Sequence, residues 1–315
     1  MASSKQKLGD IEAALRLHVD RLAGLIGPRT LSRPKSIEAT IGYIDGAWRT
    51  QGYEVSTETY DVSGGVTVAG DVTVSGDVAT NLFVEIPGRS KADRWIVVGA
   101  HYDTVSTTPG ADDNASAVAV MLEVSRLLRE HRPRRSVRFV AFACEEPPYF
   151  HTDSMGSQHH ARSARRRNEK IDGMICLESV GYFRDEPGSQ QLPPGFPEWS
   201  RRILPDRGDF LAAVGNLHSK RLAWGFRGGF RRGLRRSRLR LPLWTLCLPE
   251  RINAIRLSDN SSFWDQGYPA LMVTDTAFLR NPNYHEPTDT PETLDHRRMT
   301  AVTVGVTEAA RRLAG

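Results

Sequence analysis

The chain has 315 residues, of which 39% are hydrophobic and 25% charged, a balance that suits a soluble globular protein with a sizeable core. The formal charge is +5, and the three cysteines form no C-x-x-C pair, which argues against a disulfide framework. No run of about 18 apolar residues occurs, so we expect no transmembrane helix and no membrane partner. The first residues lack the apolar core of a secretory signal, which for a complete sequence predicts a cytoplasmic protein.

Helical spacing dominates the start of the chain. Apolar residues recur every three or four positions over 8–25 and again over 37–48, which predicts an N-terminal helical segment within 1–52. Residues 53–60 alternate like a strand. The pentad V-T-V-x-G then occurs twice. This repeat predicts two short strands joined by Gly-Asp turns, which would form an extended hairpin inserted over 62–80.

Strands and helices alternate over the rest of the chain. Expected strands cover 81–86, 94–99, 136–143, 171–177, 243–248 and 270–274, and expected helices cover 115–129, 155–167, a stretch beginning at Asn216, and 300–313. This alternation predicts an α/β fold with a mixed, mostly parallel central sheet sandwiched by helices. No Pro-, Gly- and Ser-rich linker divides the chain. We therefore expect a single domain over 1–315, with a Pro- and Arg-rich excursion at 185–250.

Arginine is concentrated within that excursion. Seven of the fourteen residues from Arg227 to Arg240 are arginine, interspersed with glycine. The pattern is similar to Arg-Gly segments of RNA-binding proteins, but only Phe226 and Phe230 could stack on bases. Charge runs are usually solvated helix faces. We therefore interpret the stretch as a solvated helix and turn and expect no nucleic-acid partner.

The first chemical signal follows the strand at 94–99. His101 and Asp103 are two positions apart, so in extended chain they share a face, and the carboxylate can orient the imidazole. The pair Asp112 and Asp113 comes shortly afterwards, at the start of an expected helix. An oriented histidine close to a second carboxylate suits a divalent metal ion.

Further candidate ligands stand at the ends of later strands. Glu145 and Glu146 follow a buried strand, Glu178 ends the next one, and His285 follows the last. Asp259 lies just upstream of that last strand. Taken singly, a strand-end Glu is usually a surface residue, and an acidic pair before a helix can be a simple cap. In combination they predict a metal site, where one Glu binds the metal and its neighbour accepts a proton.

Six motifs carry a family resemblance. They occur in order within residues 81–313 and read H-Y-D (101–103), G-A-D-D-N-A-S-A (110–117), F-A-C-E-E (142–146), L-E-S-V-G-Y (177–182), S-D-N-S-S-F-W (258–264) and N-Y-H-E-P-T-D-T-P-E-T-L-D (283–295). Together they resemble the co-catalytic zinc aminopeptidases, metallopeptidase family 28, of the bacterial type with Glu at position 178. The resemblance implies a three-layer, phosphorylase/hydrolase-like fold.

The resemblance also implies residue roles and a reaction. Two zinc ions per chain, with cobalt or manganese as substitutes, would be bound by two sets of residues that share Asp113: His101, Asp113 and Glu178, and Asp113, Glu146 and His285. Glu145 would be the general base, Asp103 would orient His101, and the Asp113–Asn114 peptide bond would be cis. Asp259, Asn260 and Tyr284 would contact the substrate. The implied reaction is hydrolysis of the N-terminal bond of a peptide or aminoacyl substrate with a free amine.

Two alternatives remain open. A glutaminyl-cyclase-like acyltransferase on the same fold uses one zinc ion, but such a relative would lose the second-site histidine pattern, and both His101 and His285 are present. A catalytically silent binding domain would keep the fold without the ligands, whereas all five are retained. One departure is Asn260, where the family often has His, because Asn cannot titrate near neutral pH.

Overall fold

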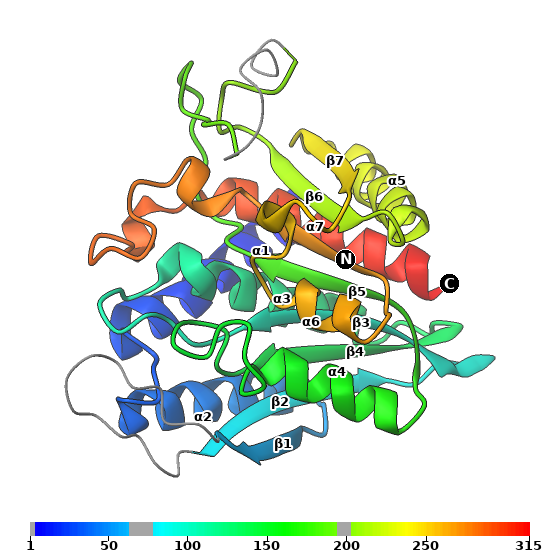
Figure 1. Ribbon diagram of the computed structural model, residues 1–315. Helices are drawn as coiled ribbons and strands as arrows, with labels where there is room; N and C mark the ends of the chain where they lie inside the picture. The colour runs from blue at the N-terminus through cyan, green and yellow to red at the C-terminus, as the bar shows by residue number, and fades with distance from the viewer. Residues whose placement is uncertain (1–3, 63–77, 194–202) are drawn as a thin grey trace.

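The computed structural model describes residues 4–62, 78–193 and 203–315. Within these ranges the strands form one eight-stranded sheet with the order β1-β2-β4-β3-β5-β8-β6-β7, from β1 at the bottom of Figure 1 to β7 at the top. The strands are β1 (Ser56–Asp61), β2 (Val78–Ile86), β3 (Lys91–His101), β4 (Arg135–Phe142), β5 (Lys170–Glu178), β6 (Leu211–Asn216), β7 (Leu243–Leu248) and β8 (Ala270–Thr274).

The centre of the sheet is parallel. Strands β4, β3, β5 and β8 run in one direction, and β6 is parallel to β7. The pairs β1–β2, β2–β4 and β6–β8 are antiparallel. Parallel strands need cover on both faces, which explains the nearly continuous apolar runs in β3 and β5. The predicted mixed, mostly parallel α/β sheet is therefore confirmed.

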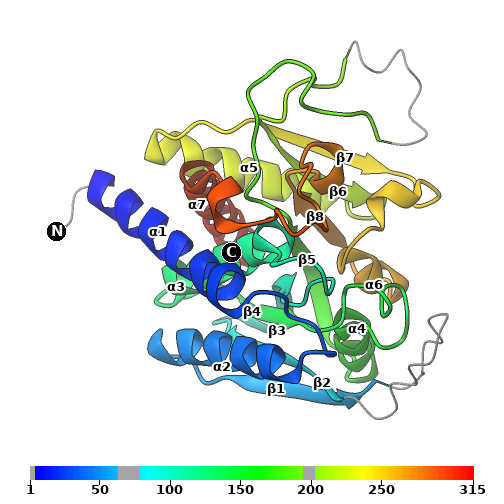
Figure 2. The same cartoon turned by 90° about the vertical axis from the view of Figure 1, so that its left-hand side faces the viewer.

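Helices cover both faces of the sheet. They are α1 (Ser4–Val19, continued by a wide helical turn at Asp20–Ile26), α2 (Pro34–Thr50), α3 (Ala117–Leu128), α4 (Gly156–Arg166), α5 (Lys220–Ser237), α6 (Asn260–Asp265) and α7 (His296–Ala314). Helices α1, α2, α3, α5 and α7 share the larger core, whereas α4 and α6 pack on the other face, as Figure 2 shows. Ile96 and Val98 belong to the larger core and Val97 to the smaller, because alternate strand residues point to opposite faces.

The expected elements are present, with one correction. The helix predicted to start at Asn216 starts at Lys220 instead, because residues 211–216 form β6. That run, L-A-A-V-G-N, contains a single β-branched residue, and pairing with β7 and β8 overrides its weak strand preference. The hairpin expected over 62–80 lies almost wholly outside the described residues. Among the described helices, none has the length and apolarity needed to span a bilayer.

Glycines on α5 allow close contact with α7. A Cβ placed on Gly229 would lie 2.5 Å from the Cα of Ala309, and one on Gly225 would lie 2.8 Å from a Leu313 methyl group. Together with Gly233, these residues repeat every four positions and share one helix face. The Arg- and Gly-rich stretch that begins at Arg227 therefore forms the second half of α5, and its glycines Gly229 and Gly233 face α7.

Substitution of these glycines tests the contact. We expect Gly229→Ala to destabilise the protein by about 1–3 kcal/mol, because the added methyl group forces two backbones apart. The control Gly228→Ala meets only the flexible Arg312 side chain, at 3.6 Å or more, and should be neutral or stabilising by up to about 1 kcal/mol. Urea unfolding measures both, and equal shifts would show that the glycine face does not determine helix spacing.

Candidate metal centre

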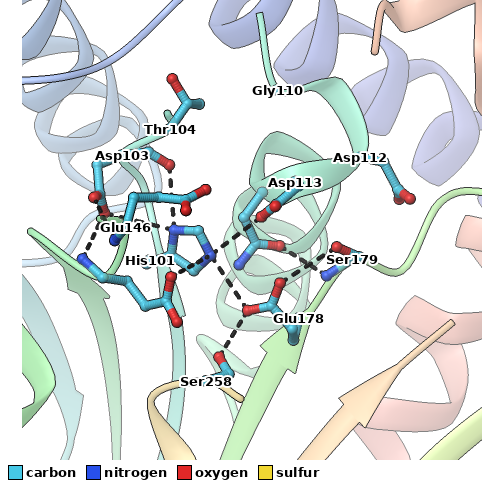
Figure 3. A network of polar contacts seen from close by, with 12 residues as sticks. His101, Asp103, Thr104, Gly110, Asp112, Asp113, Glu146, Glu178, Ser179 and Ser258 are labelled. Atoms are coloured by element: carbon cyan, nitrogen blue, oxygen red, sulfur yellow. Dashed lines mark hydrogen bonds and ion pairs between the residues drawn. The ribbon is translucent and has the colours of Figure 1, made fainter. Parts of the chain in front are cut away.

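The candidate ligands meet at the carboxyl ends of the central strands. His101 ends β3, Glu178 ends β5, and Glu146 follows β4 after a short turn. Asp113 lies in the irregular turn before α3, and His285 lies in the loop after β8. Figure 3 shows His101, Asp113, Glu146 and Glu178 converging from these separate elements. Open α/β sheets characteristically form sites at this edge.

Asp113 faces both histidines. Its Oδ1 lies 3.4 Å from Nε2 of His101, and its Oδ2 lies 3.1 Å from Nε2 of His285. Nε2 of His101 is also 3.2 Å from Glu178, and Nε2 of His285 is 3.4 Å from Glu146. The structure thus brings together both three-residue sets expected from the sequence, each with its ligand atoms within 4.8 Å of one another. Another such grouping joins His101 with Glu145 and Glu146.

Several of these atoms are buried without hydrogen-bond partners. Nε2 of His101, Nε2 of His285, Oδ1 of Asp113 and Oε1 of Glu146 have none among the described residues. Unpaired buried polar atoms are costly. Imidazole nitrogens and carboxylate oxygens are ligands that zinc accepts, so convergent orphan atoms of this kind fit a bound cation.

Burial and crowding shift the charges in the site. Burial, reinforced by Asp113, raises the pKa of Glu146 to about 7, and burial raises the pKa of Glu145 well above its ordinary value. Burial disfavours a charged His285, but contact with Asp113 and Glu146 raises the pKa of that imidazole to about 10. Protons therefore balance the carboxylates, and a divalent cation would release them on binding.

Asp103 positions more than one ligand. Nδ1 of His101 lies 3.2 Å from the main-chain oxygen of Asp103 and 3.5 Å from its carboxylate. That carboxylate accepts hydrogen bonds from the backbone N–H groups of Glu145, at 3.1 Å, and Glu146, at 3.0 Å. Asp103 therefore links the end of β3 to the turn after β4 (Figure 3).

A second acidic residue holds the turn that carries Asp113. The carboxylate of Asp289 accepts hydrogen bonds from the backbone N–H groups of Asp112, at 3.0 Å, and Asp113, at 3.2 Å. The Asn114 side chain bridges to the backbone at the end of β5, and the Asp113–Asn114 peptide bond is cis, as the resemblance implies. Sequence reasoning assigned no role to Asp289, although it lies in the motif at 283–295.

Arg29 is a buried cation behind the ligand set. Its guanidinium donates to the main-chain oxygens of Tyr102 (2.7 Å), Pro109 (2.6 Å) and Gly110 (2.9 Å), and to two carbonyls of its own segment. Burial lowers its pKa to about 10, while the charge of Asp289 opposes that shift. Arg29 thus ties the N-terminal segment to two points of the connection between β3 and α3, one next to His101 and one before Asp113. From the sequence alone, Arg29 is one charged residue in a short connection between two helices, and no motif indicates its structural role.

The three expected substrate contacts occupy different positions. Asp259 is fully buried, and neither of its carboxylate oxygens has a hydrogen-bond partner among the described residues. Asn260 is also buried and donates to the main-chain oxygen of Ile255 at 2.9 Å, so it anchors a loop. Tyr284 stacks on His285, with ring centroids 3.8 Å apart.

A cavity of about 540 Å³ adjoins the candidate ligands. Asp113, Glu145, Glu146, Glu178 and His285 contribute to its wall, which is otherwise mostly apolar. Apolar lining residues include Phe210, Val214, Trp244, Leu246, Met272 and Phe278. Strands β6 and β7 supply part of this lining from the sheet face that also carries α4 and α6. The cavity is therefore suited to an apolar group held beside the ligand set.

Relatives of the chain identify its family. The sequence profile of peptidase family M28 matches residues 81–202. Uncharacterized protein YfbL of Escherichia coli strain K12 is 37% identical over 294 residues, which cover 90% of this chain and 83% of YfbL. The chain belongs to peptidase family M28. This membership places it among the zinc metallopeptidases.

Solved structures share the fold of this M28 member. The zinc aminopeptidase BSAP from Bacillus subtilis superimposes with a TM-score of 0.70 at 16% identity, covering 95% of this chain and 94% of BSAP. Fimbriiglobus ruber glutaminyl cyclase gives a TM-score of 0.66 at 17% identity, covering 96% and 95%. Two activities therefore occur on the same architecture.

Arg29 offers a test of how the site is supported. We expect Arg29→Met to destabilise the protein by about 3 kcal/mol or more, because several buried carbonyls lose their donor. Zinc retention should also weaken, since the connection between β3 and α3, which carries Asp113, loses an anchor. The matched control is Arg33→Met, an exposed position in the same segment. Urea unfolding and competition with a chromophoric chelator measure the two effects, and identical behaviour of both variants would contradict the role of Arg29.

Proposed function

We propose that this M28 chain is a binuclear zinc aminopeptidase that hydrolyses the N-terminal bond of peptides with a free amine. The supporting observation is the pair of three-residue sets sharing Asp113, beside the additional buried carboxylate Glu145. We further propose that 1–315 form one peptidase domain, since a single sheet draws strands from residues 56–274.

The metal ligands would divide as follows. His101, Asp113 and Glu178 would hold one zinc ion, and Asp113, Glu146 and His285 the other, with cobalt or manganese able to substitute. Bound zinc would supply Lewis acidity that lowers the pKa of a water molecule and polarises the scissile carbonyl. Asp113 suits the shared role because each of its oxygens faces a different histidine.

Glu145 would move the proton. Its Oε2 lies 3.7 Å from Nε2 of His101, and its side chain contributes to the cavity wall. From that position the carboxylate takes a proton from the attacking water and returns it to the leaving amine. Asp103 fixes the Glu145 backbone and so keeps this carboxylate beside the ligand set.

The remaining residues would hold the substrate. Besides binding zinc, the carboxylates of Glu146 and Glu178 line the cavity and would attract the positively charged α-amine of the substrate. Recognition of this amine would restrict cleavage to the N-terminal bond, as in an exopeptidase. The apolar wall accepts the first side chain, and Tyr284 contributes to the same wall. Asp259 is fully buried and does not belong to the cavity wall, and Asn260 supports the loop through Ile255.

A glutaminyl-cyclase activity is the second candidate, because a cyclase shares this fold over nearly the whole chain. Cyclisation needs an N-terminal glutamine, whose side-chain amide would have to be accommodated beside the ligand set. The apolar wall favours a hydrophobic first residue instead. A catalytically silent binding domain is disfavoured, because such a domain would need neither the two complete ligand sets nor the neighbouring carboxylate of Glu145.

Replacing the base separates its role from metal binding. We expect Glu145→Gln to lower kcat about 10²–10⁴-fold, because an amide cannot accept the proton, while zinc content stays unchanged. Glu146→Gln is the matched comparison and should lose zinc as well as activity. Metal analysis and initial rates distinguish them. Loss of zinc from Glu145→Gln would instead make Glu145 a ligand, in line with its grouping with His101.

A substrate panel tests the reaction and the cavity together. Among aminoacyl-p-nitroanilides, we expect leucine, methionine and phenylalanine to exceed alanine at least tenfold in kcat/KM, because burying each methylene contributes about 0.8 kcal/mol. Chelation should abolish hydrolysis and zinc should restore it. N-acetyl-leucyl-p-nitroanilide, without a free amine, should not react. Cyclisation of N-terminal glutamine without hydrolysis of any anilide would replace the aminopeptidase with the cyclase.

A further inference from the structure

Positive charge is concentrated in a segment that the peptidase site does not use. Residues 210–249 contain no Asp or Glu and nine Lys or Arg, a formal charge of +9. Since the whole chain carries +5, subtracting this segment leaves −4 for all other residues. The basic character of the protein is therefore a local property of this segment.

The fold gathers this charge on one side of α5. Leu222, Phe226, Phe230 and Leu234 are buried, and the glycines face α7. The opposite side is exposed or half-buried, and we call it the arginine face of α5: Arg221, Trp224, Arg227, Arg231, Arg232, Arg235 and Arg236. Figures 1 and 2 show α5 at the periphery, alongside α7.

Most of the arginine face lacks counter-charges. Arg232 and Arg236 both approach Glu308 of α7, a carboxylate that Arg311 also shares. The other arginines of the face make no ion pair with a described residue. Each guanidinium can donate two parallel hydrogen bonds to a phosphate, so an unpaired row of them favours a phosphate-rich partner.

An exposed tryptophan lies within the same face. Trp224 is 58% exposed, and the guanidinium of Arg227 lies 4.9 Å from its ring centroid. Tryptophan is enriched where a membrane meets water, because its ring is apolar and its N–H is polar. Nucleic-acid platforms stack successive bases on several aromatics, but Phe226 and Phe230 are buried here.

We propose that the arginine face of α5 docks the protein on the surface of an anionic phospholipid bilayer. The 18-residue helix is about 27 Å long, so its arginines can contact many headgroups of a planar surface together. Its apolar side is packed in the core, so attachment is electrostatic and reversible. The expectation of no membrane partner rested on the lack of a spanning segment, which this docking does not require.

Docking leaves the catalytic cavity accessible. Leu211 and Ala213 of β6 pack in the core shared with α5, whereas Ala212 and Val214 line the cavity. Alternate residues of a strand point to opposite sheet faces. The cavity therefore lies on the opposite side of the sheet from the arginine face. When the protein is docked through this face, the cavity is turned away from the lipid.

Vesicle co-sedimentation of the full chain tests the proposal. We expect binding to phosphatidylcholine vesicles with about 30% phosphatidylserine to exceed binding to pure phosphatidylcholine at least tenfold at about 50 mM salt. Raising the salt to about 500 mM should release the protein, because exposed charges are then screened. Equal binding to both vesicles, or no binding to either, would overturn the proposal.

Variants locate the surface. Arg231→Gln with Arg235→Gln should weaken binding to anionic vesicles at least tenfold, and Trp224→Ala should weaken it without abolishing its salt dependence. The control, Arg165→Gln with Arg166→Gln, removes the same charge from exposed positions of α4 and should change binding less than twofold. Thermal unfolding verifies that each variant folds. Equal losses for both double variants, or binding to a single-stranded oligonucleotide without binding to vesicles, would overturn the proposal.

Discussion

Repulsion among buried carboxylates is the constraint on which the rest of this structure depends. Asp113, Glu145, Glu146 and Glu178 are buried within one small region. Burial raises the pKa of Glu145, Glu146 and Glu178 and so favours their neutral forms, whereas contact with His101 and His285 outweighs burial at Asp113 and lowers its pKa. The histidines, a buried guanidinium and nearby backbone N–H groups offset this charge, and they leave several polar atoms without partners. Two bound cations would complete the balance and would also activate water for hydrolysis.

The scaffold holds these charges through links between elements that are distant in sequence. Asp103 joins the end of β3 to the turn after β4, and Asp289 joins the last ligand loop to the turn before α3. Arg29 connects both β3 and that turn to the N-terminal segment. Folding of the first helices is thereby coupled to the positions of the ligands, although no candidate ligand lies on those helices.

Motifs made the grouping of the candidate ligands predictable, because His101, Glu146 and Glu178 each lie at or just after the end of an apolar strand, at one edge of the sheet. The mixed, mostly parallel sheet was predictable from the alternation of strand and helix patterns along the chain. Strand β6 was missed, since L-A-A-V-G-N carries little local preference and forms only through its neighbours. The roles of Arg29 and the α5 glycines were also out of reach, because their partners, Tyr102 and Ala309, are distant in sequence.

Zinc stoichiometry is the most direct test of the claim that two ligand sets share one aspartate. Chelator-stripped protein would be titrated with zinc, dialysed and analysed for bound metal, alongside His285→Ala. The account predicts two zinc ions per chain, and one in the variant, which removes a ligand from only the second set. A single zinc ion in the unaltered chain, or the same content with and without His285, would contradict it.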